Sequence, residues 1–154
     1  MAKLHKHLIV HAHVDNPPVK KDERFVEQWL TDIVHAMDME VLKEASAEYC
    51  EQVGNRGMTA GVYITTSHMI LHTWDECDQP FIEFDIYTCS DLDPEMAFKA
   101  LEVFGVKNIS YKFLDRYNGL TDLTPVPMAR VEKDTAWTSL KKRLNLVKKL
   151  FKAS

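Results

Sequence analysis

The chain lacks the features that mark several common protein classes. Its three cysteines, Cys50, Cys77 and Cys89, form neither an even disulfide framework nor a CxxC pair, which favours free thiols in a reducing cytoplasm. No apolar run approaches the about 18 residues that cross a bilayer. Histidines interrupt the apolar stretch near the N terminus, and no small-residue cleavage site follows it. We therefore expect a cytoplasmic protein with no export signal and no membrane span.

A strong excess of charge of one sign is also missing. The formal net charge of −4 gives no general argument for binding nucleic acid. With 154 residues, 45% of them hydrophobic and 27% charged, the chain suits one globular domain. A domain of this size buries roughly two thirds of its unfolded surface, so it can form a core without disulfides.

Glycine and proline are scarce, with five and six copies, and several of them stand between segments of clear periodicity. Apolar residues at helical spacing predict one helix, and Asp-Pro-Glu before a second apolar group predicts another, which Gly105 ends. Alternation predicts strands elsewhere, whereas residues 40–53 fit either a helix or a strand. The predicted order is strand 4–14, helix 22–38, turn 54–57, strands 59–65, 68–73 and 81–88, helix 93–104 and strand 108–115. This order favours an α/β (α+β) two-layer sandwich, with an antiparallel sheet and helices on one face.

The last part of the chain differs in composition. Pro125 and Pro127 mark a loop, and a basic amphipathic helix is expected over residues 134–154. Such a helix can bind an anionic membrane or an acidic partner, but it more often packs on its own protein or on a second subunit. We therefore divide the chain into a main domain, residues 1–116, and a C-terminal segment, residues 117–154.

Four histidines share one face of the first predicted strand: His5, His7, His11 and His13. Closely spaced imidazoles can bind zinc or a related metal. Hydrogen-bonded or solvated histidines are the commoner outcome on a strand face, so we assign no metal site.

The chemistry is concentrated in residues 65–76, TTSHMILHTWDE, followed by FDIYTCS at 84–90. This pattern resembles that of the short bacterial and archaeal S-adenosylmethionine decarboxylase proenzymes, and weaker similarity runs from the first strand to about residue 116. The matching residues are Ser67, His68, His72, Thr73, Trp74, Glu76, Asp85, Thr88 and Cys89.

The resemblance implies a pyruvoyl cofactor made from the chain itself. The hydroxyl of Ser67 attacks the carbonyl of Thr66 to give an ester, and elimination with hydrolysis leaves a pyruvoyl group on the downstream fragment. Cleavage then separates residues 1–66 from residues 67–154. The substrate S-adenosylmethionine forms a Schiff base with the pyruvoyl group, which serves as the electron sink for decarboxylation. The product supplies spermidine biosynthesis.

Residue roles follow from the same resemblance. His72 is the proton-transfer residue of processing, and Thr59 stands where the family has an assisting serine. Cys89 corresponds to the acid that protonates the decarboxylated carbon, and Glu76 to the carboxylate that holds the substrate ribose. His68 follows the cleavage site and receives no separate step. The resemblance also implies a homodimer, with active sites built across the subunit boundary.

Several positions depart from the family pattern. Thr66 replaces a glutamate before the cleaved serine, and Asp75 replaces a proline. Val53 stands where an aromatic residue stacks on the substrate adenine, although Tyr49 is an alternative. Two other functions therefore stay open: a pyruvoyl decarboxylase of ornithine or arginine, and an inactive homologue that acts as a binding partner.

Overall fold

The computed structural model describes residues 2–125 and 142. Its helices and strands are β1 (Lys6–Val14), α1 (Glu23–Ala36), β2 (Val41–Cys50), β3 (Gly57–Ile64), β4 (Ser67–Trp74), β5 (Phe81–Thr88), α2 (Pro94–Leu101), β6 (Val106–Asp115) and β7 (Thr121–Asp122). Short 3-10 turns precede α1, at Lys20–Asp22, and follow α2, at Glu102–Phe104.

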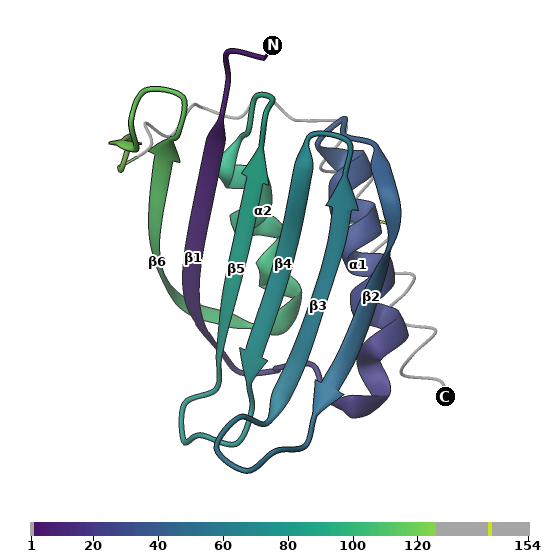
Figure 1. The fold of residues 1–154 in the computed structure, drawn as a ribbon. Coiled ribbons are helices and arrows are strands. Elements are labelled where there is room, and N and C mark those ends of the chain that lie inside the picture. Colours follow the sequence, from purple (N-terminus) through teal and green to yellow (C-terminus); the bar gives the residue numbers. More distant parts are fainter. Residues whose placement is uncertain (1, 126–141, 143–154) are drawn as a thin grey trace.

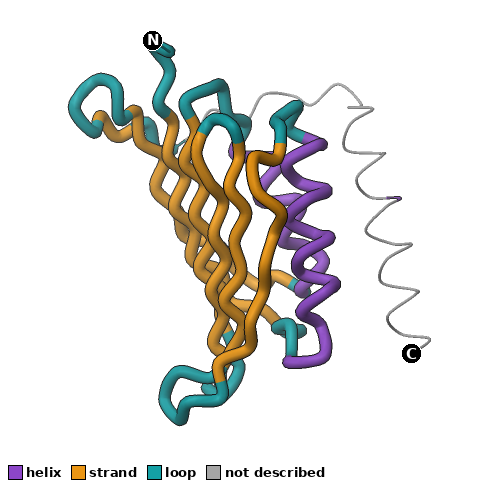
Figure 2. Tube along the Cα trace, turned by 45° about the vertical axis from the view of Figure 1, so that its right-hand side comes forward, coloured by secondary structure: helices purple, strands orange, loops and turns teal. Residues whose placement is uncertain are grey.

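The strands form one sheet in the order β2-β3-β4-β5-β1-β6-β7, and every neighbouring pair is antiparallel. Both α-helices cover the same face of this sheet (Figures 1 and 2). The predicted two-layer sandwich is therefore confirmed. Insertion of β1 between β5 and β6 brings the N-terminal histidines beside two strands that are distant in sequence.

Alternation along each strand separates a covered face from a bare one. In β5, Ile82, Phe84 and Ile86 are buried beneath the helices, while the residues between them face the other way. Within the described part of the chain, no helix covers that second face (Figure 2). The motif residues His68, His72 and Asp85 have their side chains on this bare face, whereas Thr73 and Thr88 are buried.

Trp29 of α1 joins the two helices to the sheet. Its ring is fully buried, contacts Phe84 of β5 and Phe104, and its Nε1 donates a hydrogen bond of 3.1 Å to the Ala100 carbonyl of α2. A buried indole needs such a partner because an unpaired N–H would lose its hydration without compensation. The apolar stripe predicted for this helix thus positions the layer that supports the sheet.

The structure resolves the segment that the sequence left open, since residues 41–50 form the edge strand β2. Two carboxylates of α1 accept backbone hydrogen bonds from it: Glu27 from Ala47 and Glu23 from Tyr49. The helix thereby satisfies donors on the edge strand, which favours the strand over a helix.

The helix predicted over residues 93–104 is shorter, because its last turn is a 3-10 turn. Asp93 caps its start by accepting from Glu95 N, and Gly105 ends the turn at a φ of 70°. The two-residue strand β7 was not predicted. The basic helix expected over residues 134–154 lies outside the described residues apart from position 142. Among the helices that are described, none has the length and apolarity to span a bilayer.

Candidate active site

The peptide group between Thr66 and Ser67 lies in the turn from β3 to β4 (Figure 1). The backbone N–H of Cys89 donates a 2.9 Å hydrogen bond to the Thr66 carbonyl. Ser67 has a φ of 146°, which is unfavourable for a residue with a side chain. A polarised carbonyl therefore lies directly beside a hydroxyl on strained backbone.

The side chain of Thr66 is held as well. Thr88 donates its hydroxyl to Thr66 Oγ1 at 2.8 Å, and Thr88 Oγ1 itself accepts from the backbone of Ser90. Thr88 is fully buried, so its hydroxyl has little freedom to leave these partners. A threonine before the candidate cleavage site is thus built into the turn.

Cys89 lies among groups that can exchange protons. Its Sγ is 3.7 Å from His5 Nδ1 and 3.8 Å from the hydroxyl of Tyr87, and these two partners are 2.9 Å apart. Burial and the hydrogen bond with Cys89 raise the pKa of Tyr87, while the Arg116 guanidinium, 4.0 Å from the ring centroid, opposes this. The phenol therefore stays protonated at neutral pH and can donate a hydrogen bond.

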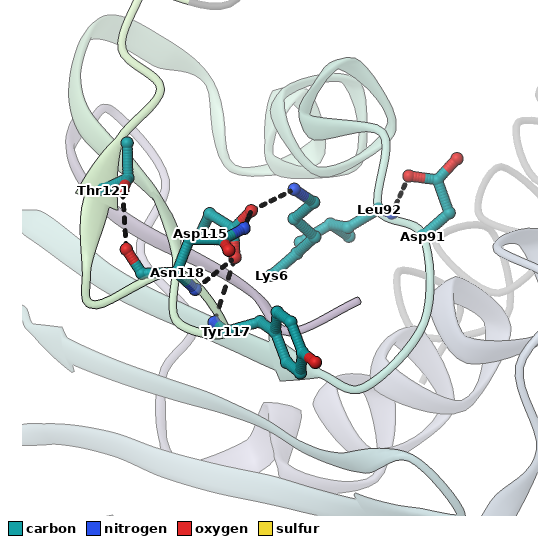
Figure 3. A network of polar contacts seen from close by, with 7 residues as sticks. All are labelled: Lys6, Asp91, Leu92, Asp115, Tyr117, Asn118 and Thr121. Atoms are coloured by element: carbon teal, nitrogen blue, oxygen red, sulfur yellow. Dashed lines mark hydrogen bonds and ion pairs between the residues drawn. The ribbon is translucent and has the colours of Figure 1, made fainter. Parts of the chain in front are cut away.

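A polar network fixes the loop that carries Arg116 (Figure 3). Lys6 forms a 3.3 Å ion pair with Asp115, which also accepts from the side chain of Asn118 and the backbone of Tyr117. The Asn118 hydrogen bond, followed by Lys6, lowers the pKa of Asp115. The same loop stacks the Tyr117 ring on His5, so it positions the neighbours of Cys89.

His68 continues the arrangement on the bare face of the sheet. Its Nδ1 is 3.2 Å from Ser67 Oγ, and its Nε2 is 3.1 Å from one oxygen of Asp85. The other oxygen of Asp85 is hydrogen-bonded to Nε2 of His7. Three strands, β4, β5 and β1, thus contribute to one chain of polar contacts that begins at Ser67.

The remaining predicted site residues gather at the opposite end of the sheet. His72 Nδ1 is 2.7 Å from Thr59 Oγ1, and the two residues are directly paired across β3 and β4. Glu76 follows β4 and lies 4.0 Å from Arg56, and Val53 is 82% exposed in the turn before β3. The structure therefore brings Thr59 together with His72, but not with Ser67.

Asp75, which departs from the family pattern, has a defined partner at this end. The hydroxyl of Tyr49 donates to Asp75 Oδ2 at 2.6 Å. This hydrogen bond is the main cause that raises the pKa of Tyr49 to about 12. Tyr49, the alternative aromatic to Val53, is thus anchored beside the loop that carries Glu76.

Two groups of predicted site residues are consequently separated within one chain. Ser67 and His72 are five positions apart on the straight strand β4, which corresponds to roughly 16 Å. Ser67 pairs with Thr88, whereas His72 pairs with Glu83 nearer the other end of β5. Side chains cannot bridge this distance, so His72 does not reach the Ser67 of its own chain.

Three of the four N-terminal histidines, His7, His11 and His13, alternate along β1 as predicted, and His5 directly precedes this strand. His5 and His7 belong to the contacts described above, whereas His11 lies 3.5 Å from Glu83 and packs against His13. Over the described residues, no group of three or more histidine, cysteine or acidic side chains is placed to hold a metal ion.

A sequence profile of the S-adenosylmethionine decarboxylase family matches residues 6–117. The chain belongs to this family. It is 30% identical over 113 residues to the S-adenosylmethionine decarboxylase proenzyme of Archaeoglobus fulgidus, covering 72% of this chain and 96% of that protein. The Pyrococcus furiosus proenzyme is 28% identical over 118 residues, which cover 76% of this chain and 75% of that protein.

A crystal structure also resembles the fold. The adenosylmethionine decarboxylase of Aquifex aeolicus VF5 superposes with a TM-score of 0.55 at 19% identity, covering 73% of this chain and 89% of that one. The match to the S-adenosylmethionine decarboxylase family ends at residue 117.

Several residues around Ser67 have no role that the sequence alone predicts. Asp85 and Thr88 belong to the motif but received no function, and His7 and Tyr87 were not connected with the site. Alternation in β5 places Asp85 and Tyr87 on the bare face, which was a usable signal. The contact with His7 depends on the pairing of β1 with β5, which has no local signal.

Proposed function

We propose that the chain is a self-processing decarboxylase that acts on S-adenosylmethionine through a pyruvoyl group made from Ser67. The observation that carries this proposal is the Thr66 carbonyl, which accepts from Cys89 N–H beside the strained Ser67. Attack by Ser67 Oγ places negative charge on that carbonyl oxygen, where the N–H donor stabilises it. Cleavage of the C–N bond then gives an ester between Thr66 and Ser67.

The later steps convert the ester into the cofactor. Removal of the Ser67 α-proton by His72 eliminates the Thr66 carboxylate, and hydrolysis of the resulting dehydroalanine releases ammonia and leaves the pyruvoyl group. Once formed, this group supplies the electron sink that decarboxylation requires. Cys89, with His5 and Tyr87 beside its thiol, is suited to deliver the proton to the decarboxylated carbon.

The separation of the two groups within one chain supports a homodimer with composite sites. A two-fold axis through the bare sheet face brings Ser67 and Cys89 of one copy against His72 and Glu76 of the other. That face carries three large exposed apolar side chains, Ile9, Tyr63 and Ile70, at 42%, 56% and 37% exposure. Burial of these side chains between two sheets would stabilise the dimer.

Glu76 and its surroundings form the proposed nucleoside end of the composite site. The carboxylate of Glu76 is suited to hold the substrate ribose, as the family pattern implies, and Val53, or Tyr49 in its place, is the position at which that pattern stacks the adenine. The product, decarboxylated S-adenosylmethionine, would supply spermidine biosynthesis in the cytoplasm.

Denaturing mass spectrometry of the purified protein beside Ser67→Ala tests the proposal. We expect two fragments, residues 1–66 and 67–154, with pyruvoyl at the start of the second, and an intact chain in the variant. An intact wild-type chain under all conditions would remove the electron sink and leave the binding-partner function in the lead. For the processed protein, release of carbon dioxide from S-adenosylmethionine but not from ornithine or arginine identifies the substrate.

The pH dependence of processing should report on His72. Burial lowers the pKa of His72 below its usual 6.5, and Glu83 partly opposes this by favouring the charged ring. Abstraction of the α-proton needs the neutral His72 ring, so the rate of this step should fall when the pH drops below the lowered pKa of His72. Glu83→Gln removes the opposing charge, and the acidic limb of the rate profile should move to lower pH.

Glu44→Gln, which removes the same charge from the exposed edge strand β2, is the matched control. Its profile should superpose on that of the wild type. Glu83 also faces His11. If His72 is the titrating base, Glu83→Gln should therefore cause the same shift of the acidic limb in a His11→Asn background. An acidic limb that moves upward in Glu83→Gln would contradict this assignment.

A further inference from the structure

His68 lies between the Ser67 hydroxyl and the Asp85 carboxylate, and its hydrogen bonds determine which ring nitrogen carries the proton. An ionised carboxylate only accepts hydrogen bonds, so His68 Nε2, 3.1 Å from Asp85, must be the protonated nitrogen. The neutral ring then has its lone pair on Nδ1, which is 3.2 Å from Ser67 Oγ. The Ser67 O–H therefore donates to a nitrogen that can take up its proton.

Surrounding groups hold this arrangement in place. Asp85 is fixed from its second oxygen by His7 Nε2, and the side chain of His7 is only 17% exposed. The Tyr87 ring packs against both imidazoles, with centroid distances of 5.9 Å to His68 and 5.7 Å to His7. His68 consequently has a carboxylate that orients it and an aromatic ring that limits its rotation.

The order serine, imidazole, carboxylate is the arrangement that activates a hydroxyl for acyl transfer. The attacked group is also in place, since the Thr66 carbonyl accepts from Cys89 N–H at 2.9 Å. His72, the family's proton-transfer residue, is roughly 16 Å along the strand from Ser67 and acts only from a partner chain. The acyl shift therefore has a complete set of groups within a single chain.

We propose that His68 is the general base of the first processing step, oriented by Asp85 and, through it, by His7. This inference rests on the proposed self-processing. As Ser67 Oγ bonds to the Thr66 carbonyl carbon, its proton moves to His68 Nδ1. When the C–N bond breaks, the imidazolium returns that proton to the Ser67 nitrogen, which leaves an ester and a free amine. His72 is then required only for the later removal of the α-proton.

Trapping with hydroxylamine distinguishes the two histidines, because it cleaves an ester at neutral pH but not a peptide bond. His72→Ala should accumulate the ester and be cut by hydroxylamine between residues 66 and 67. His68→Asn keeps a polar atom near the position of Nδ1 but cannot accept a proton, so its ester should form at least about 100-fold more slowly. The double variant should resist hydroxylamine as His68→Asn does.

Chemical rescue separates catalysis from structure. Added imidazole should restore ester formation in His68→Gly but not in Ser67→Ala, and a purely structural role of His68 would give no rescue. Asp85→Asn should slow ester formation less than His68→Asn. His35→Asn, the same change on the exposed end of α1, should process as the wild type does.

Formation of the ester in His68→Asn at the wild-type rate would overturn the proposal. So would a His68→Gly variant that folds, as judged by circular dichroism, but is not rescued by imidazole. Failure of the proposed function has a different result, since the wild type itself would then stay uncut and resist hydroxylamine.

Discussion

Two chains that cannot process themselves are expected to restore processing when they are produced together. Ser67→Ala lacks the nucleophile, and His72→Ala lacks the base that removes the α-proton of Ser67. Each variant produced alone should therefore stay uncut. In a mixed dimer, Ser67 of the His72→Ala chain meets the intact His72 of the Ser67→Ala chain. We expect the His72→Ala chain, and only that chain, to appear as residues 1–66 and 67–154.

Different affinity tags on the two chains allow the mixed dimer to be isolated. Statistical pairing would place about half of the His72→Ala chains in mixed dimers. A Ser67→Ala/His72→Ala double variant paired with His72→Ala is the matched control, because it offers no intact His72 and should give no cleavage. Uncut chains in the purified mixed dimer would show that the two groups do not meet across a subunit boundary.

The sequence predicted most of the fold because most strands show a local alternation of apolar and polar residues. In β5, strict alternation of Ile82, Phe84 and Ile86 with polar residues is sufficient to identify a strand with one covered face. The edge strand β2 has no such pattern, since only Ala47 is buried along it. Its conformation is decided by pairing with β3 and by two carboxylates of α1, which are contacts between distant segments.

The site was predictable to the extent that its residues lie in one motif. The separation of Ser67 from His72 was implicit in the sequence, because five residues of a predicted strand cannot bend back on themselves. In contrast, His7 beside Asp85 belongs to β1 and His5 beside Cys89 directly precedes that strand, whose place between β5 and β6 is a property of the topology. His5 and His7 therefore looked like members of a histidine cluster, whereas each contacts a different residue of the motif.

Gly57→Ala is expected to have the largest effect on stability of any small substitution near the site. Gly57 begins β3 at a φ of 151°, and an added Cβ would lie 1.8 Å from the backbone oxygen of Thr73. Neither atom belongs to a flexible side chain, so β3 and β4 would have to separate. We expect a loss of at least about 4 kcal/mol in the free energy of unfolding, since strain and a backbone clash act together.

Gly54→Ala, three residues earlier in the turn before β3, provides the matched comparison. Its φ of 84° is also unfavourable for alanine, but nothing lies within 4 Å of the added Cβ, so the expected loss is about 1 kcal/mol. Urea unfolding at one protein concentration, in the uncut Ser67→Ala background, measures both. Because Met58 N donates to Thr73 Oγ1 and Thr59 pairs with His72, separating these strands also parts Thr59 from His72. With Ser67 restored, Gly57→Ala should therefore lose processing together with stability, whereas equal stability of the two alanine variants would contradict the close approach of β3 and β4.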